Sequence, residues 1–143
     1  MEIACNKVVD LSGYKIVLVN GKTNRSYKTI TLSETCSPTS NFVVRNDVGQ
    51  IQNGIRDGIV LVDSEGDIIE FISYEGTLSY KGRNSVDIGV TENNNTPVGD
   101  SLQKVGTGCI ASDFKWREIT SSASKGRIND GQFISCGGSR DEL

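Results

Sequence analysis

Hydrophobic and polar residues alternate over short segments of this chain, which indicates β-strands rather than helices. Residues 14–19 carry apolar side chains at every second position, on one face of an extended segment. These side chains are Tyr14, Ile16 and Leu18. The segment ends at Asn20-Gly21, a dipeptide typical of tight turns because both residues accept positive φ. Residues 27–32 are then expected to form the returning strand of a hairpin.

A second hairpin is predicted over residues 58–74. Residues 58–62 and 67–74 are apolar at nearly every position, and the polar loop between them carries Gly66 near its end. Strands with so few polar positions are expected at the centre of a sheet, where both faces are partly covered.

Further strands are expected at residues 42–45, 101–105 and 114–116. Residues 76–100 are mostly polar and are predicted as a long loop, and the chain from Thr120 onward is expected to wrap the outside. Short strands with turns between them indicate an all-β sandwich or barrel. The spacing of Cys, Trp and Cys that marks antibody domains is missing.

The length of 143 residues fits one domain, and no linker composition interrupts it. We expect a sandwich domain over residues 1–132 and a C-terminal tail over residues 133–143.

The charge and hydropathy of the chain argue against two classes of partner. The net charge is −3 and the pI is about 5.0, and no cationic stripe is present for nucleic acid. No apolar run approaches the ~18 residues of a membrane span, so membrane insertion is not expected. The first residues turn polar too early for a signal peptide, and the chain is expected to be part of a larger secreted precursor.

Four cysteines are spread along the chain, too far apart for zinc knuckles, and no histidine is present to complete such a site. They are Cys5, Cys36, Cys109 and Cys136. They either form two disulfides, for which three connectivities are possible, or remain as four thiols. If a bridge exists, Cys109 with Cys136 is the favoured pair, because both flank the last predicted strands.

Two motifs bear on localisation. Asn24-Arg25-Ser26 and Asn94-Asn95-Thr96 are glycosylation sequons in polar segments, which fits a secreted origin. Residues 140–143 read RDEL and resemble a retrieval signal, so the endoplasmic reticulum lumen is the alternative to the extracellular space.

Candidate chemistry is sparse. The absence of histidine removes the commonest general base, and no nucleophile elbow or phosphate loop appears, so neither catalytic residues nor a cofactor are predicted. Asp63, Glu65 and Asp67 are weak candidates for calcium ligands, but their place in a hairpin loop explains them without an ion. Arg56 and Asp57 are candidate partner contacts, because loops on a rigid scaffold often bind.

Several segments, taken in order, resemble lamin-tail-type domains. They are Glu2-Ile3-Ala4 with VDLSGY at residues 9–14, and then residues 54–62, 67–76, 97–103, 114–116 and 125–129, with Lys125 where the family has proline. The resemblance covers residues 2–132 and implies an immunoglobulin-like β-sandwich, closest to modules of secreted bacterial and protist proteins. The family's usual first strand, before the Glu2-Ile3 segment, is missing.

The resemblance implies a non-catalytic binding or scaffold module that contacts a protein or cell-surface partner. The alternatives are a calcium- or carbohydrate-binding module, or an accessory domain of an extracellular nuclease. Within such a sandwich Leu11 is expected to anchor the core. Trp116, the single tryptophan, is expected to plug the core, with an exposed ligand platform as the alternative.

Overall fold

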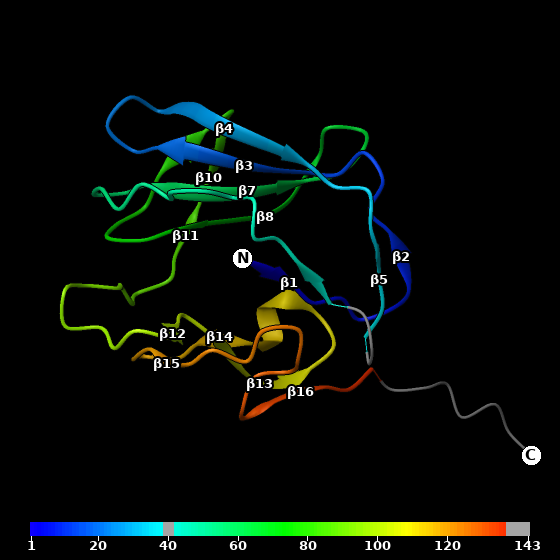
Figure 1. The fold of residues 1–143 in the computed structure, drawn as a ribbon. Coiled ribbons are helices and arrows are strands. Elements are labelled where there is room, and N and C mark those ends of the chain that lie inside the picture. Colours follow the sequence, from blue (N-terminus) through cyan, green and yellow to red (C-terminus); the bar gives the residue numbers. More distant parts are fainter. Residues whose placement is uncertain (39–41, 137–143) are drawn as a thin grey trace, which may run out of the picture.

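The computed structural model describes residues 1–38 and 42–136 and is all-β (Figure 1). Over these residues the regular structure consists of strands and one 3-10 turn, Ala111–Asp113. The RDEL sequence of residues 140–143 lies outside the described residues. One large sheet and five small sheets make up the described fold.

The large sheet has five strands in the order β11-β8-β7-β3-β4. Their bounds are β3 Lys15–Asn20, β4 Arg25–Thr31, β7 Gly58–Val62, β8 Ile68–Ser73 and β11 Val86–Asp87. Neighbours pair antiparallel except β11, which runs parallel to β8. Both predicted hairpins are confirmed, and β7 and β8 occupy the interior positions expected from their apolar character.

Both faces of this sheet are buried. On β3, Ile16 and Leu18 belong to a core on the inner face, which also holds Leu11. Val17 and Val19 pack on the opposite face, together with Leu78 from the section predicted as a polar loop. One isolated leucine gives no periodic signal, which is why its role in covering the sheet was not predicted.

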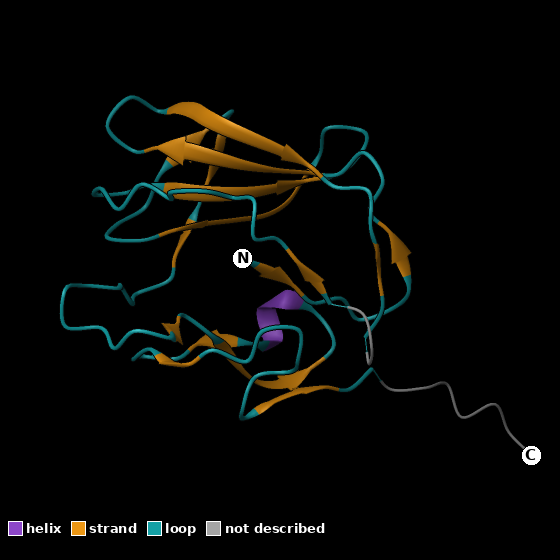
Figure 2. Ribbon diagram, viewed as in Figure 1, coloured by secondary structure: helices purple, strands orange, loops and turns teal. Residues whose placement is uncertain are grey.

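The small sheets are built from very short strands. They pair β1 (Glu2–Ile3) with β6 (Val43–Val44), β2 (Val9–Asp10) with β5 (Thr35–Cys36), β9 (Ser79–Tyr80) with β10 (Arg83–Asn84), and β12 (Asp100–Ser101) with β15 (Ser121–Ser122); β13 (Lys104–Gly108) lies between β14 (Lys115–Trp116) and β16 (Gln132–Ile134). Strands β12 to β16 gather on one side of β1, and the large sheet lies on the other (Figure 2).

The described fold continues through Cys136. Strand β16 crosses the boundary expected after residue 132, and the Ser135 amide donates to the Gly108 carbonyl over 2.8 Å. Strand β16 pairs in parallel with β13, so Phe133 and Ile134 take part in a sheet.

The turn after β3 differs from the predicted one. Asn24, with φ of 53°, takes the left-handed conformation there, rather than Gly21. Gly21 is needed for a steric reason, because a Cβ atom at this position would lie 2.4 Å from the Arg56 carbonyl oxygen. The turn residue and the loop that contains Arg56 are therefore in direct contact.

A buried carboxylate ties these two loops together. Asp57 is 1% exposed, and its Oδ1 atom accepts the Gly21 amide over 2.7 Å. Its Oδ2 atom accepts the Gly54 amide over 2.8 Å. A buried carboxylate with two backbone donors has a structural role, because these bonds compensate for the removal of its charge from water.

Two disulfides are present, Cys5–Cys36 and Cys109–Cys136. The pairing favoured from the sequence is confirmed, and the remaining two cysteines form the other bridge. The Asn6 side-chain amide donates to the Cys109 carbonyl over 2.9 Å, so the segment after β1 contacts both bridges. Two disulfides are consistent with an oxidising compartment such as the secretory pathway.

Replacement of Asp57 by alanine is expected to destabilise the fold by about 2–5 kcal/mol, because two backbone amides lose their acceptor in a buried setting. Urea unfolding followed by circular dichroism measures this change. Asp130→Ala, on an exposed side chain, is the matched control and is expected to stay within about 0.5 kcal/mol of wild type. Equal stabilities of the two variants would contradict the structural role of Asp57.

Removal of the second bridge by Cys109→Ser with Cys136→Ser is expected to lower the free energy of unfolding by about 3–4 kcal/mol, from the entropy of a 27-residue closed loop. The measurement is urea unfolding of the double variant beside oxidised wild type. An unchanged midpoint would show that this bridge does not constrain the unfolded chain.

Candidate functional site

The acidic cluster predicted from the sequence forms at the tip of the β7–β8 hairpin. Asp63, Glu65 and Asp67 each place a carboxylate oxygen within 4.8 Å of the others. However, Asp63 Oδ1 accepts the amides of Glu65, Gly66 and Asp67 over 3.0, 2.9 and 2.8 Å. Asp63 thus closes the turn with its own side chain, as aspartate does in many loops.

Arg56 and Asp57 face different surroundings although they are neighbours in the chain. Arg56 is exposed and has a left-handed backbone with φ of 64°. Asp57 is buried against Gly21 and Gly54, as described above. Of the two candidate partner contacts, the side chain of Arg56 is therefore the one that a partner can reach.

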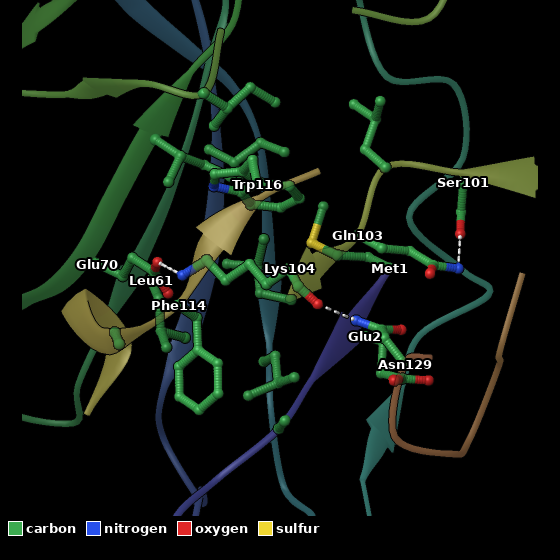
Figure 3. A pocket seen from close by; sticks show the side chains of 18 of the residues that line it. Met1, Glu2, Leu61, Glu70, Ser101, Gln103, Lys104, Phe114, Trp116 and Asn129 are labelled. Carbon is green, nitrogen blue, oxygen red and sulfur yellow. Dashed lines mark hydrogen bonds and ion pairs between the residues drawn. The ribbon is translucent and has the colours of Figure 1, made fainter. Parts of the chain in front are cut away.

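A concave feature lies between the large sheet and the layer of strands β12 to β16. It is a cavity of about 1150 Å³ (Figure 3). The large sheet contributes apolar side chains from β7 and β8, namely Ile59, Leu61 and Ile72. The opposite wall carries Leu102, Phe114 and Trp116. The cavity is partly open to solvent, and its volume is many times that of a single water molecule.

One ion pair joins the two walls. Glu70 on β8 accepts a hydrogen bond from the Lys104 ammonium group on β13 (Figure 3). The Lys104 nitrogen also lies 5.6 Å from the centre of the Trp116 ring, within cation–π range. The Lys104 side chain is 19% exposed and that of Glu70 is 37% exposed, so the cation is the more sheltered member.

Two side-chain amides hold the wall opposite the large sheet. Gln103 donates to Ser101 Oγ over 3.0 Å and to the Ser122 carbonyl over 2.8 Å. Asn129 donates to the Lys104 carbonyl over 3.0 Å. These bonds fix β13 to the segments around it, so the backbone that carries Lys104 is held in place.

Different groups line the cavity near the Tyr74 cluster and near the disulfides. At one end a cluster centred on Tyr74 and Ile88 packs against Leu102 and Trp116. Burial raises the pKa of the Tyr74 hydroxyl, which keeps it protonated as the donor to the Gln52 carbonyl. At the other end, Cys5, Asn6 and Cys109 line the cavity, beside the two disulfides.

This arrangement suits non-covalent binding of a mainly apolar molecule. Small-molecule sites are typically clefts of about 300–1000 Å³ with hydrophobic walls and a few fixed polar groups. The cavity here is slightly larger, and the Glu70–Lys104 pair supplies polar groups inside it.

Few features of the sequence indicate this site. Glu70 interrupts the apolar strand β8, a signal that would have singled it out, but its partner lies 34 residues away. Trp116 was expected either to plug the core or to form an exposed platform; it is half-buried and lines the cavity.

No family model, curated protein or solved structure matches the chain. Among the described residues, no helix is long and apolar enough to span a bilayer.

Substitution of Asp63 separates the role in the turn from a role in ion binding. Asp63→Ala is expected to cost about 1–2 kcal/mol, because three amides lose their acceptor, whereas Asp63→Asn keeps an oxygen at the Oδ1 position and stays close to wild type. Thermal unfolding with and without millimolar calcium is the measurement. We expect no shift with calcium; a rise in midpoint that Asp63→Asn abolishes would instead establish a metal site.

Proposed function

We propose that this chain is a non-catalytic binding module and that its ligand enters the cavity between the large sheet and strands β12 to β16. The observation that carries the proposal is an apolar space of about 1150 Å³ in a chain of 143 residues. Apolar walls that face water are less favourable than apolar walls covered by a hydrophobic ligand. A ligand that filled this space would cover those walls and stabilise the protein.

We further propose that the fold is an immunoglobulin-like sandwich of the lamin-tail type, with the small sheets as its second layer. The residues of the VDLSGY segment behave as such a motif requires. Leu11 is buried, and Asp10 accepts the Ser12 amide and hydroxyl. Gly13 turns the chain into β3 with φ of 83°.

The proposed setting is extracellular, within a larger secreted protein that has a protein or cell-surface partner. Both disulfides and the exposed sequon residues Asn24 and Asn94 support this setting. The net charge of −3 argues against nucleic acid as the partner, because phosphate binding depends on clustered cations.

A neutral naphthylamine dye tests the cavity, since its emission rises on transfer from water to apolar surroundings. We expect wild type to bind the dye and to gain thermal stability from it. Leu61→Trp places a larger side chain in the cavity and is expected to weaken dye binding by about tenfold or more, because the space is then occupied.

Val98→Trp is the matched control, because Val98 is fully exposed and does not line the cavity. It is expected to bind the dye as wild type does. Circular dichroism establishes that both variants keep the β-fold. If wild type fails to bind the dye, or if Leu61→Trp binds it equally well, the cavity is not the binding site.

A further inference from the structure

We infer that the ligand of this cavity is an amphiphile with one hydrocarbon chain and a carboxylate head, and that Lys104 binds the carboxylate. This inference rests on the proposed function and adds the chemical class of the ligand. It follows from the way in which Lys104 is supported, from the unequal exposure of the ion pair, and from the apolar walls around it.

The Lys104 ammonium group is held at a defined position inside the cavity. Glu70 binds it from β8, and the Trp116 ring lies 5.6 Å away on β14. An ammonium group has three N–H donors, and Glu70 accepts from it through one oxygen, so donors remain for a second anion. Figure 3 shows the Lys104 side chain reaching toward Glu70 across the space between the walls.

The ion pair favours an anionic head over a cationic one. A cation would have to displace Lys104 from both Glu70 and Trp116, whereas an anion can share or replace Glu70 at the ammonium group. Glu70 is also the more exposed partner, at 37% against 19%, so it can turn to water when a ligand carboxylate arrives. Charge-assisted hydrogen bonds gain strength in such sheltered surroundings.

The walls fit a hydrocarbon chain attached to that head. Ile59 and Ile72 face the cavity from the large sheet, and Leu102 and Phe114 face it from the other side. The volume of about 1150 Å³ far exceeds the needs of a carboxylate alone. Burial of each additional methylene group is expected to raise affinity about three- to fourfold until the cavity is filled.

The experiment titrates the disulfide-bonded chain with octanoate, decanoate and dodecanoate below their micellar concentrations. Trp116 is the single tryptophan and lines the cavity, so its fluorescence reports occupancy. Calorimetry provides a second readout that does not depend on the tryptophan. We expect affinity to rise with chain length, and dodecanol to bind about tenfold or more weakly than dodecanoate.

Three variants test the role of Lys104. Lys104→Met removes the charge but keeps an apolar chain, and is expected to weaken dodecanoate about tenfold while leaving dodecanol unchanged. Glu70→Gln removes the competing anion and is expected to tighten dodecanoate several-fold. Lys115→Met is the matched control, because Lys115 is exposed on β14 and does not line the cavity. It is expected to bind as wild type does.

The possible results separate the inference from the proposed function. Three results would each contradict binding of a carboxylate head: equal affinity for dodecanoate and dodecanol, equal dodecanoate binding by Lys104→Met and Lys115→Met, or tighter binding of dodecyltrimethylammonium. The cavity would then remain a binding site, but for a ligand with another head group. If no alkyl ligand and no naphthylamine dye binds wild type, the proposed function fails as well.

Discussion

The large sheet is apolar on both faces, and the rest of the molecule is arranged by the need to cover them. On β3, the successive residues Ile16 to Val19 are all buried. Because their side chains alternate between the two faces, both faces of the sheet must be covered. The outer face is covered by Leu78 and Tyr80 around the short strands β9 and β10. The inner face is covered in two parts, and the difference between these parts creates the cavity.

One part of the inner face lies over β3 and β4 and is covered by the N-terminal segment. Met1, Ile3 and Val9 from the N-terminal segment, with Val43 of β6, close against it. The other part lies over β7 and β8, where Ile59 and Leu61 are partly buried while Val60, on the opposite face, is completely buried. The N-terminal segment therefore covers part of the face, and the cavity lies between this segment, strands β7 and β8, and the strands opposite.

Sequence periodicity predicted the elements whose signal is local. The two hairpins were found because alternation and turn residues lie within single segments, and the Cys109–Cys136 bridge because its cysteines flank the last predicted strands. Strand β15 was missed because Ser121–Ser122 carry no strand preference of their own, and β16 because its three residues are too few to give a periodic signal. Their pairing depends on β12 and β13, which are distant in sequence.

The candidate site was beyond local analysis for the same reason. The register of β7 with β8 sets Glu70 opposite Leu61 on the inner face, and the separate pairing of β13 with β14 sets Lys104 beside Trp116. Neither relation is visible in one segment of sequence. Asp57 was also beyond local analysis. It lies in a polar loop and was expected at the surface, but it is buried because it accepts a hydrogen bond from the amide of Gly21, 36 residues away.

A cavity between apolar walls persists only if the walls are held apart, because collapse would recover the lost contacts. Here the two ends supply that support. The Tyr74 and Ile88 cluster fills one end between the layers, and the disulfides with Asn6 fix the other. Between the two ends, the Glu70–Lys104 ion pair spans the gap. Bringing the apolar walls together would separate or desolvate these two charges, which costs free energy. The same pair that keeps the walls apart thus sets the polarity that an incoming ligand meets.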